Sequence, residues 1–307
     1  SLIMRRDGSS NFARGQRWGN FPSISAGWVI TQENFMEKTR NWLDFLKIRA
    51  SWGQNGNCNI TPYQYLASIA FDGHAGYSFG NIRNSYYQGA YPDILPNPNV
   101  TWETSEQTNI GIDARFLNQR LGVTVDYYIK KTKDWLVQAP IMDTYGTNAP
   151  YINGGDVENK GFEVSLDWHD TIGSDFNYSA GLNFSYNKNE ITRIDNAEQI
   201  IWGSTNVLSE GTSAVYRCMV GEPIGYFYGY KTAGVFQNQA DIDAWKAQYG
   251  ENCFLQINPQ PGDLKFVDTD GNKKIDERDK TNIGKPMPDW RMGINLSANY
   301  KGFDLSI

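Results

Sequence analysis

The chain has 307 residues and a formal net charge of −6, with 40% hydrophobic and 20% charged side chains. This balance excludes wholesale disorder, and it excludes an electrostatic nucleic-acid binder, which needs a basic face to release counterions from phosphates. No apolar run reaches about 18 residues, so the sequence predicts no membrane-spanning helix.

Strict alternation of apolar and polar residues is the dominant pattern of the chain, and it predicts β-strands. In residues 121–129, for example, Leu121, Val123, Val125 and Tyr127 share one face. The predicted strands are, in chain order, residues 46–52, 109–116, 121–129, 161–169, 177–187 and 290–300. Residues 32–44 break the alternation and predict a short helical or turn segment between strands.

The lengths of these runs favour a membrane protein. Most extend over roughly 9–12 residues, about what a tilted strand needs to cross hydrocarbon, whereas ordinary globular strands cluster near 5–6 residues. Their apolar faces begin or end on aromatic rings, which suit a lipid–water boundary. These rings are Trp52, Trp168, Tyr178, Trp290 and Tyr300.

Short and long connections alternate between the predicted strands. Tight turns are expected at 117–120, 171–175 and 301–302, and long connections at 53–102, 132–160 and 190–289. Outer-membrane barrels have short periplasmic turns and longer extracellular loops, whereas compact soluble domains disfavour long loops. We therefore predict an all-β protein, a segment of an antiparallel transmembrane β-barrel with long extracellular loops, rather than a soluble β-sandwich or β-helix.

The chain ends and the cysteines give less information about fold and function. The sequence starts at Ser1 without an initiator Met and stops at Ile307 within a strand-like run, so we expect an internal piece of a longer polypeptide. Cys58, Cys218 and Cys253 are widely spaced and match no metal-ligand pattern. Their odd number permits at most one internal disulfide and indicates no compartment.

Several longer segments carry a family resemblance. They are residues 5–10 (RRDGSS), 17–28 (RWGNFPSISAGW), 46–56 (LKIRASWGQNG), 97–111 (NPNVTWETSEQTNIG), 157–163 (VENKGFE) and 262–271 (GDLKFVDTDG). In this order they resemble the SusC/RagA family of TonB-dependent outer-membrane transporters of Bacteroidetes, and the likeness covers nearly the whole chain.

The resemblance implies a particular architecture and activity. The intact barrel would have about 22 strands, a size known for plugged transporters. Residues 1–307 would belong to one barrel domain whose plug, TonB-box and last strands lie outside this sequence, and residues 190–288 would form a long extracellular loop region. The implied activity is TonB-dependent import of oligosaccharides or oligopeptides for nutrient uptake, with a SusD-like surface lipoprotein as a lid and no catalysis.

Two other functions remain open from the sequence. A passive outer-membrane porin would share the barrel, and a plug with a TonB-box would exclude it. A soluble calcium-dependent glycan-binding β-protein would share the acidic loop, and it would need no detergent.

The acidic loop Asp268–Asp279 has the spacing of a calcium-binding loop. Oxygen donors at positions 1, 3, 5, 7, 9 and 12 are supplied by Asp268, Asp270, Asn272, the Lys274 carbonyl, Asp276 and Asp279. Position 6 is Lys273 where Gly normally permits a sharp turn, and position 12 is Asp where Glu reaches further. The loop therefore predicts structural Ca²⁺, and the alternative is an Asx-rich turn without metal.

Aromatic residues in the expected loops are candidates for stacking on sugar rings or peptide side chains, and the alternative is that they pack the loops together. They are Tyr63, Tyr65, Tyr86, Tyr87, Trp202, Tyr216, Tyr226 and Tyr228. Three lysines, Lys130, Lys131 and Lys133, cluster near the outer end of a predicted strand. They predict a solvated face or a contact with the lipid bilayer and lipopolysaccharide.

Enzymatic readings fit poorly. Residues 76–80 match the G-x-S-x-G pattern of hydrolases, but they lie in a loop-like stretch rich in Gly, Tyr and Asn instead of between a strand and a helix. His74 and His169 have no partner at metal-ligand spacing. We therefore expect no enzyme and no zinc site.

Overall fold

The computed structural model describes residues 1–77, 87–205 and 207–307. The chain divides into two compact units. The sheet unit comprises Ser1–Gln199 and Asp289–Ile307, and the loop unit comprises Ile200–Pro288. Within the described ranges, no helix combines the length and the apolar character needed to cross a membrane.

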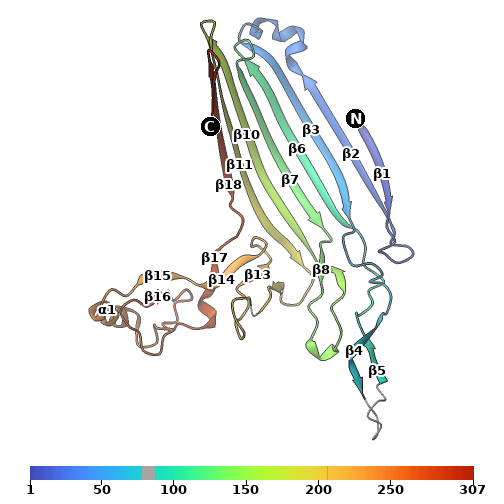
Figure 1. Ribbon diagram of the computed structural model, residues 1–307, viewed down its shortest axis with the longest axis vertical. Coiled ribbons are helices and arrows are strands. Elements are labelled where there is room, and N and C mark those ends of the chain that lie inside the picture. Colours follow the sequence, from blue (N-terminus) through green and yellow to red (C-terminus); the bar gives the residue numbers. More distant parts are fainter. Residues whose placement is uncertain (78–86, 206) are drawn as a thin grey trace. The chain divides into compact units, whose positions relative to one another are not determined.

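The sheet unit is built on one antiparallel sheet of nine strands, in the order β1-β2-β3-β6-β7-β10-β11-β18-β19 (Figure 1). The order of the strands in the sheet follows their order in the chain, so each strand pairs with the sheet strands before and after it, as in an up-and-down sheet. The bounds are β1 Leu2–Gly8, β2 Trp18–Val29, β3 Leu43–Asn57, β6 Glu103–Phe116, β7 Leu121–Lys133, β10 Gly155–Ile172, β11 Phe176–Ile194, β18 Trp290–Tyr300 and β19 Phe303–Ser306.

The six predicted strands are confirmed, but most are longer than predicted. β10 has 18 residues and β11 has 19, so the pairing continues well past the predicted 161–169 and 177–187. The reason is that backbone pairing persists where the side chains on both faces become polar, and the alternation signal disappears there. The sequence had set no bounds for β1 and β2, whose apolar faces are interrupted by Gly, Ser and Arg.

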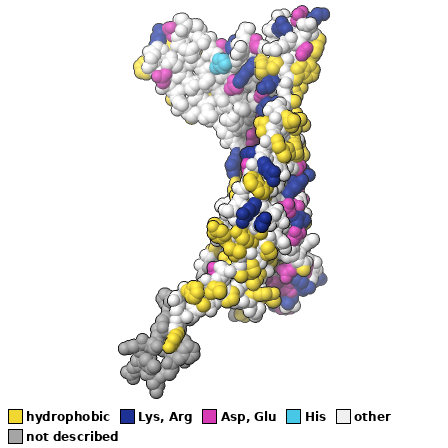
Figure 2. All heavy atoms as spheres, turned by 90° about the vertical axis from the view of Figure 1, so that its right-hand side faces the viewer, with side chains coloured by type: hydrophobic (Ala, Val, Ile, Leu, Met, Phe, Trp, Pro, Cys, Tyr) yellow, Lys and Arg dark blue, Asp and Glu magenta, His cyan; other side chains and the backbone are white. Residues whose placement is uncertain are grey.

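The register brings the predicted apolar faces together on one side of the sheet. One transverse row contains Ile48, Ile112, Val125, Val164, Phe184 and Met292. The large side chains of this apolar face are exposed, for example Ile112 and Met292. Figure 2 shows hydrophobic side chains running along the strands near the β1 edge, with lysines and arginines among them. An exposed apolar face of this extent suits lipid.

Ion pairs cross the opposite, polar face over glycine residues. Arg49 on β3 reaches past Gly111 to Asp126 on β7, at 2.6 Å, while also pairing with Asp113 at 3.0 Å. Arg115 reaches past Gly122 to Asp167 on β10 in the same way, at 2.7 Å. A Cβ atom at either glycine would overlap the ends of the bridging side chains, so these ion pairs in their present positions depend on Gly between them.

The connections follow the predicted alternation of short and long. Residues 117–119 all have φ near +60°, and Lys301 and Gly302 also have positive φ, as tight turns require. η1 (Ile30–Gln32) and η2 (Asn34–Thr39) confirm the helical segment predicted within 32–44. The long connections contain small sheets, which the sequence had not indicated. In the sheet unit these are β4 (Ile69–Tyr77) with β5 (Tyr87–Pro92), and β8 (Leu136–Gln138) with β9 (Tyr151–Asn153), beside η3 (Asp143–Tyr145).

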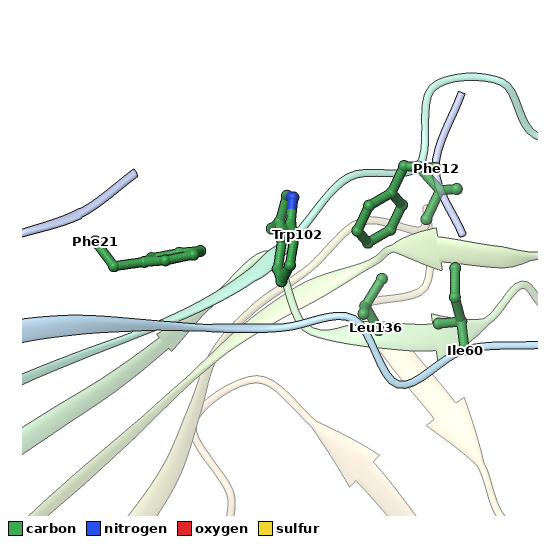
Figure 3. Packing of buried hydrophobic residues seen from close by; sticks show 6 residues of the cluster. Phe12, Phe21, Ile60, Trp102 and Leu136 are labelled. Atoms are coloured by element: carbon green, nitrogen blue, oxygen red, sulfur yellow. The ribbon is translucent and has the colours of Figure 1, made fainter. Parts of the chain in front are cut away.

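A buried hydrophobic cluster ties the base of these connections to the sheet (Figure 3). Its centre is Trp102, whose ring lies 5.4 Å from that of Phe12 and 5.5 Å from that of Phe21 between centroids. The other members are Ile60, Val100 and Leu136. Because these residues come from five separate segments, the cluster fixes where the long connections leave the strands.

The loop unit contains two small sheets and the only α-helix among the described residues. One sheet has the order β12-β13-β14-β17, and the other pairs β15 with β16. Helix α1 begins after Asn238, whose side chain caps it by accepting from the Asp241 amide. The bounds are β12 Ile200–Trp202, β13 Tyr216–Met219, β14 Tyr226–Tyr230, β15 Thr232–Val235, α1 Gln239–Tyr249, β16 Leu264–Phe266, η4 Glu277–Asp279 and β17 Lys280–Gly284.

Candidate functional site

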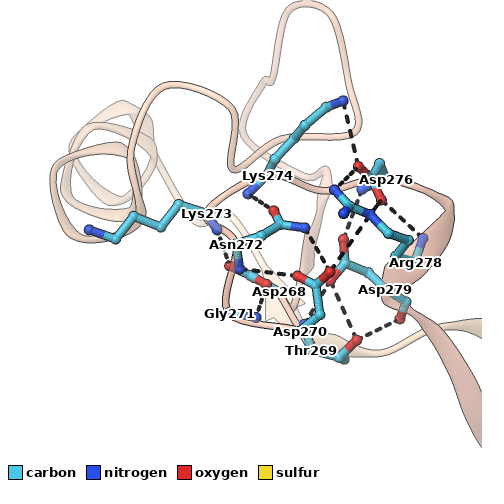
Figure 4. A network of polar contacts seen from close by, with 10 residues as sticks. All are labelled: Asp268, Thr269, Asp270, Gly271, Asn272, Lys273, Lys274, Asp276, Arg278 and Asp279. Carbon is cyan, nitrogen blue, oxygen red and sulfur yellow. Dashed lines mark hydrogen bonds and ion pairs between the residues drawn. The ribbon is translucent and has the colours of Figure 1, made fainter.

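The acidic loop brings three of its carboxylates together. Asp268, Asp270 and Asp279 each contribute an oxygen, and these atoms lie within 4.8 Å of one another (Figure 4). Asp279 is fully buried at 0% exposure, and its two oxygens accept from the backbone amides of Thr269 and Asp276, each at 2.8 Å. The loop therefore closes on itself around a buried carboxylate.

Backbone amides hold the other two carboxylates in place. Asp268 accepts from the amides of Gly271 and Lys273, each at 2.6 Å. Asp270 accepts from the backbone amide of Asn272 at 3.0 Å and from its side-chain amide at 2.7 Å. A carboxylate has about four acceptor sites, so these contacts leave capacity for a further ligand.

The remaining predicted ligands are not part of this trio. The Asp276 carboxylate accepts from the Arg278 guanidinium, with Nη2 at 3.0 Å, and it also caps η4. The side-chain oxygen Oδ1 of Asn272 accepts from the Lys274 backbone amide at 2.7 Å. The Arg278 Nε atom lies 3.8 Å from the Asp270 carboxylate. Arg278 therefore forms an ion pair with one of the three clustered carboxylates.

Lys273 occupies the position where calcium loops normally carry Gly, and the chain turns there nonetheless. Its φ is +62°, in the left-handed region, and Gly271 has φ of +75°. The loop thus adopts the sharp bend at a strained residue.

Electrostatics keep this loop anionic. Burial acts to raise the pKa of Asp268, but the backbone donors from Lys273, Gly271 and Asn272 outweigh it and hold that pKa below its usual range. The Arg278 side chain hydrogen-bonds Asp276 and holds its pKa far below the ordinary value. Such a site offers hard oxygen ligands to a cation.

Three of the candidate stacking residues surround an arginine that the sequence analysis had not singled out. The Arg217 guanidinium carbon lies 3.6 Å from the ring centroid of Tyr228, 5.2 Å from that of Trp202 and 5.6 Å from that of Tyr226. Its Nε also donates to the Tyr226 hydroxyl at 2.5 Å. Tyr226 is 1% exposed. These rings therefore pack the sheet of the loop unit around a cation.

Of the other aromatic candidates, Tyr216 precedes Arg217 on β13, while Tyr63, Tyr65 and Tyr87 belong to the sheet unit. The backbone amide and the hydroxyl of Ser204 contact the Tyr216 hydroxyl at 3.3 and 3.5 Å. Tyr63 and Tyr65 form an edge-to-face pair in the sheet unit with centroids 6.3 Å apart, and Tyr63 is exposed. Tyr87 begins β5 and is exposed, while Tyr86 lies outside the described residues.

The cysteines and histidines form no reactive constellation within the residues that the structure describes. Cys58, Cys218 and Cys253 are all free thiols. Burial raises the pKa of the Cys218 and Cys253 thiols, which makes them poor nucleophiles. His169 lies exposed on β10 opposite Ser179. The G-x-S-x-G stretch falls largely outside the described residues.

Comparison with known proteins identifies the family. Residues 4–305 match the family model described as TonB dependent receptor-like, beta-barrel. The chain is 34% identical to TonB-dependent receptor P3 of Formosa agariphila over 309 residues, covering 100% of this chain and 29% of that protein. It is also 34% identical to TonB-dependent receptor SusC of Bacteroides thetaiotaomicron, covering 100% of this chain and 28% of that protein.

Solved structures agree with the sequence matches. The RagAB peptide transporter superposes with a TM-score of 0.77 at 25% identity, over 99% of this chain and 30% of that chain. The chain thus spans about a third or less of the length of these relatives. It belongs to the TonB-dependent receptor family and forms part of the β-barrel of such a receptor in the bacterial outer membrane.

Proposed function

We propose that the complete protein imports an oligosaccharide or an oligopeptide across the outer membrane, driven through TonB. The observation that supports this most is the two-faced sheet. One face presents exposed apolar rows to lipid, while the other carries ion-paired Arg49 and Arg115 along what would be a water-filled interior. A soluble glycan-binding protein would not expose an apolar face of this extent.

A SusD-like lipoprotein lid is the partner that we propose for the long connections. The loop unit exposes isolated large apolar side chains, including Ile257 at 96% and Leu208 at 75%. Isolated exposed apolar residues are common on protein surfaces, so the support for this partner is the similarity to SusC and to the RagAB peptide transporter. TonB would act on the N-terminal part of the complete receptor.

One solved relative is named a peptide transporter, which supports an oligopeptide as the substrate. Packing around Arg217 buries Tyr226, which removes that ring from the candidates for stacking on a substrate, whereas Trp202 contacts the same guanidinium and is still 48% exposed. Trp202, Tyr63 and Tyr87 are exposed and are the better candidates for substrate contact.

The test of import uses the complete receptor in its own bacterium. Cells lacking the gene should fail to take up one class of radiolabelled oligosaccharide or oligopeptide, and the complete gene should restore uptake. A proton uncoupler should abolish that uptake. Uptake that persists with the uncoupler would instead establish a passive porin, and mass spectrometry of the co-purified ligand would identify the substrate class.

We also propose that the acidic loop binds Ca²⁺ as a structural ion. Asp268, Asp270 and Asp279 place three carboxylates within 4.8 Å, and like charges this close need a compensating cation beyond Arg278. Oxygen ligands suit Ca²⁺, and the role that we propose for the ion is to stabilise the loop.

Calcium binding is tested on the purified receptor by limited proteolysis with and without a chelator. The chelator should accelerate cleavage within residues 263–283, and Asp268→Ala with Asp270→Ala should make cleavage fast in both conditions. Asp243→Ala with Glu251→Ala removes the same charge from exposed positions and should behave as wild type. Cleavage that is indifferent to the chelator in the wild type would contradict the proposal.

A further inference from the structure

Lysines continue the apolar face of the sheet beyond its last apolar row. On β10 the apolar-face residues run from Trp168 to Phe162 and are followed by Lys160 and Glu158. On β11 the same face continues from Tyr186 to Lys188 and Glu190. The three lysines that the sequence had grouped near this end are divided between faces, because β7 alternates. Lys131 and Lys133 share the apolar face, whereas Lys130 lies on the polar face.

The register places these charges immediately above a row of aromatic rings. Tyr127, Phe162, Tyr186 and Trp290 are cross-strand neighbours on β7, β10, β11 and β18. The rings of Phe162 and Tyr186 lie 5.8 Å apart. At the other end of the apolar face, Asp170 pairs with Tyr178, about 26 Å along the strand from Phe162. At a tilt near 40° this corresponds to about 20 Å along the membrane normal, so the apolar face between the aromatic rows accounts for most of the roughly 25 Å apolar band of a barrel.

The depth of the lysines follows from strand geometry. Residues on one face are spaced about 7 Å along a strand, or about 5 Å along the membrane normal at a tilt near 40°. Lys160 and Lys188 therefore lie about 5 Å beyond the aromatic row. The headgroup zone extends about 5–8 Å beyond the hydrocarbon on each side, so both lysines fall within it. This end of the strands leads to the long connections, which are extracellular in outer-membrane barrels.

Like charges lie opposite each other across β10 and β11, and the opposed lysines favour the binding of an anion. Lys160 lies directly opposite Lys188, and Glu158 lies directly opposite Glu190, so each cross-strand pair repels. Ion pairs within each strand offset this repulsion, since Lys160 contacts Glu158 at 2.5 Å and Lys188 contacts Glu190 at 2.8 Å. Lys131 on β7 also reaches across to Glu158 on β10, at 3.5 Å. The lysine cluster is defined as Lys131, Lys160 and Lys188. Glu106 lies directly opposite Lys131 on β6 and pairs with Lys133 at 2.9 Å, so with these two residues included four lysines face three carboxylates.

The cations also lie outermost. The lysine side chains are 50–62% exposed, whereas those of Glu158 and Glu190 are 16% and 37% exposed. The carboxylates therefore position the lysine stems, and the ammonium groups present positive charge outward at a depth where lipid headgroups lie.

We propose that the lysine cluster binds a phosphate group on the headgroup of a phosphorylated glycolipid of the outer leaflet, whose acyl chains pack on the aromatic row below. A phosphate between Lys160 and Lys188 removes their mutual repulsion and receives three ammonium donors when Lys131 joins. The binding is independent of the cargo that the receptor carries, so import and lipid binding can fail separately.

The test measures lipid binding to the complete receptor in detergent. The probe is diphosphoryl lipid A, compared with the same lipid after dephosphorylation, and bound lipid is counted by native mass spectrometry. Each lysine near an anionic membrane surface raises affinity about fivefold. Lys160→Gln with Lys188→Gln should therefore weaken binding of the diphosphoryl lipid about 25-fold, while Lys160→Arg with Lys188→Arg should retain it.

The matched control is Lys47→Gln with Lys130→Gln, which removes two lysines from the polar face of the same sheet and should bind the lipid as wild type. Wild-type affinity in the Lys160→Gln, Lys188→Gln receptor would overturn the proposal. So would equal binding of the dephosphorylated lipid, which would place the affinity in the aromatic row alone. Displacement of the lipid by millimolar inorganic phosphate would also overturn it, since the site would then take free phosphate.

Discussion

The sheet unit and the loop unit are held together by different kinds of contact. In the sheet unit, transverse rows of like residues repeat across strands, as Ile112, Val125 and Val164 do. In the loop unit, single side chains join segments of irregular backbone. Arg217 packs against rings from β12 and β14, and Lys265 pairs with Asp241 at 2.7 Å beside the ring of Phe236. In the sheet unit, the effect of a substitution on stability should therefore depend on which face of the sheet it lies on and how deep it lies in the membrane. In the loop unit, the effect should depend on which individual contact is removed.

The largest effect is expected for a charge placed at mid-depth on the apolar face. Val164 pairs with Val125 and Phe184, away from both aromatic rows. Val164→Arg should destabilise the complete receptor by about 2–4 kcal/mol, because the guanidinium would lie in hydrocarbon. The measurement is urea unfolding of the receptor in lipid vesicles.

The neighbouring residue provides the control. Ser165 lies at the same depth on the polar face, where it borders a hollow lined also by Asn183 and Arg291. Ser165→Arg should cost less than about 1 kcal/mol. Equal losses for the two variants would mean that the apolar face does not meet lipid.

A smaller effect is expected where an ion pair crosses a glycine. Gly122→Val places a Cβ on the Arg115 guanidinium and the Asp167 carboxylate, so we expect a loss of about 1–3 kcal/mol from steric displacement. Gly293 has no atom within 4 Å of its Cβ position, and Gly293→Val should be neutral or slightly stabilising. Urea unfolding of both variants checks this, and a neutral Gly122→Val would show that the bridge is not tight.

The contrast between the units also explains what the sequence could predict. The apolar faces of β7, β10 and β11 were predictable because a period of two is a local property of the chain. The ends of β10 and β11 were not, since from Lys188 onward both faces of β11 are largely polar while backbone pairing continues. The family resemblance, carried by long segments, supplied the barrel context that no single strand contains.

The loop unit was less predictable for physical reasons. Helix α1 has visible signals, since Asn238 caps it and Gly250 ends it, but such residues also occur in turns. The spacing of the acidic loop predicted that Asp268, Asp270 and Asp279 lie near one another, and their carboxylates lie within 4.8 Å. The spacing did not reveal that Asp276 pairs with Arg278. Ligand spacing shows which positions can face an ion, but it does not show which neighbouring side chains bind the same carboxylate.

Within the loop unit, removing one cation should loosen one sheet. Arg217→Ala deletes the contacts with Trp202, Tyr226 and Tyr228, so hydrogen exchange in β12–β14 should accelerate by about 5- to 30-fold, corresponding to about 1–2 kcal/mol. Arg217→Lys should lie between this variant and wild type. Peptides from β7 and β10 provide the internal control, and faster exchange there would show that the two units unfold together.

The smallest effect is the pH response of the acidic loop, measured in a chelator. The pKa of Asp268 is lowered by backbone donors that outweigh burial, so its charged form is favoured by folding. A group whose pKa is lower in the folded state than in the unfolded state stabilises the fold at pH values above its unfolded pKa, which is near 3.9. This stabilisation is lost as the pH falls through the folded-state pKa. Hydrogen exchange in residues 268–279, corrected for intrinsic rates, should therefore stay level from about pH 7 to 5 and accelerate only below about pH 4. Asp268→Asn should loosen the loop at every pH and flatten the acid response, whereas acceleration already between pH 7 and 5 would show that a different group controls the loop.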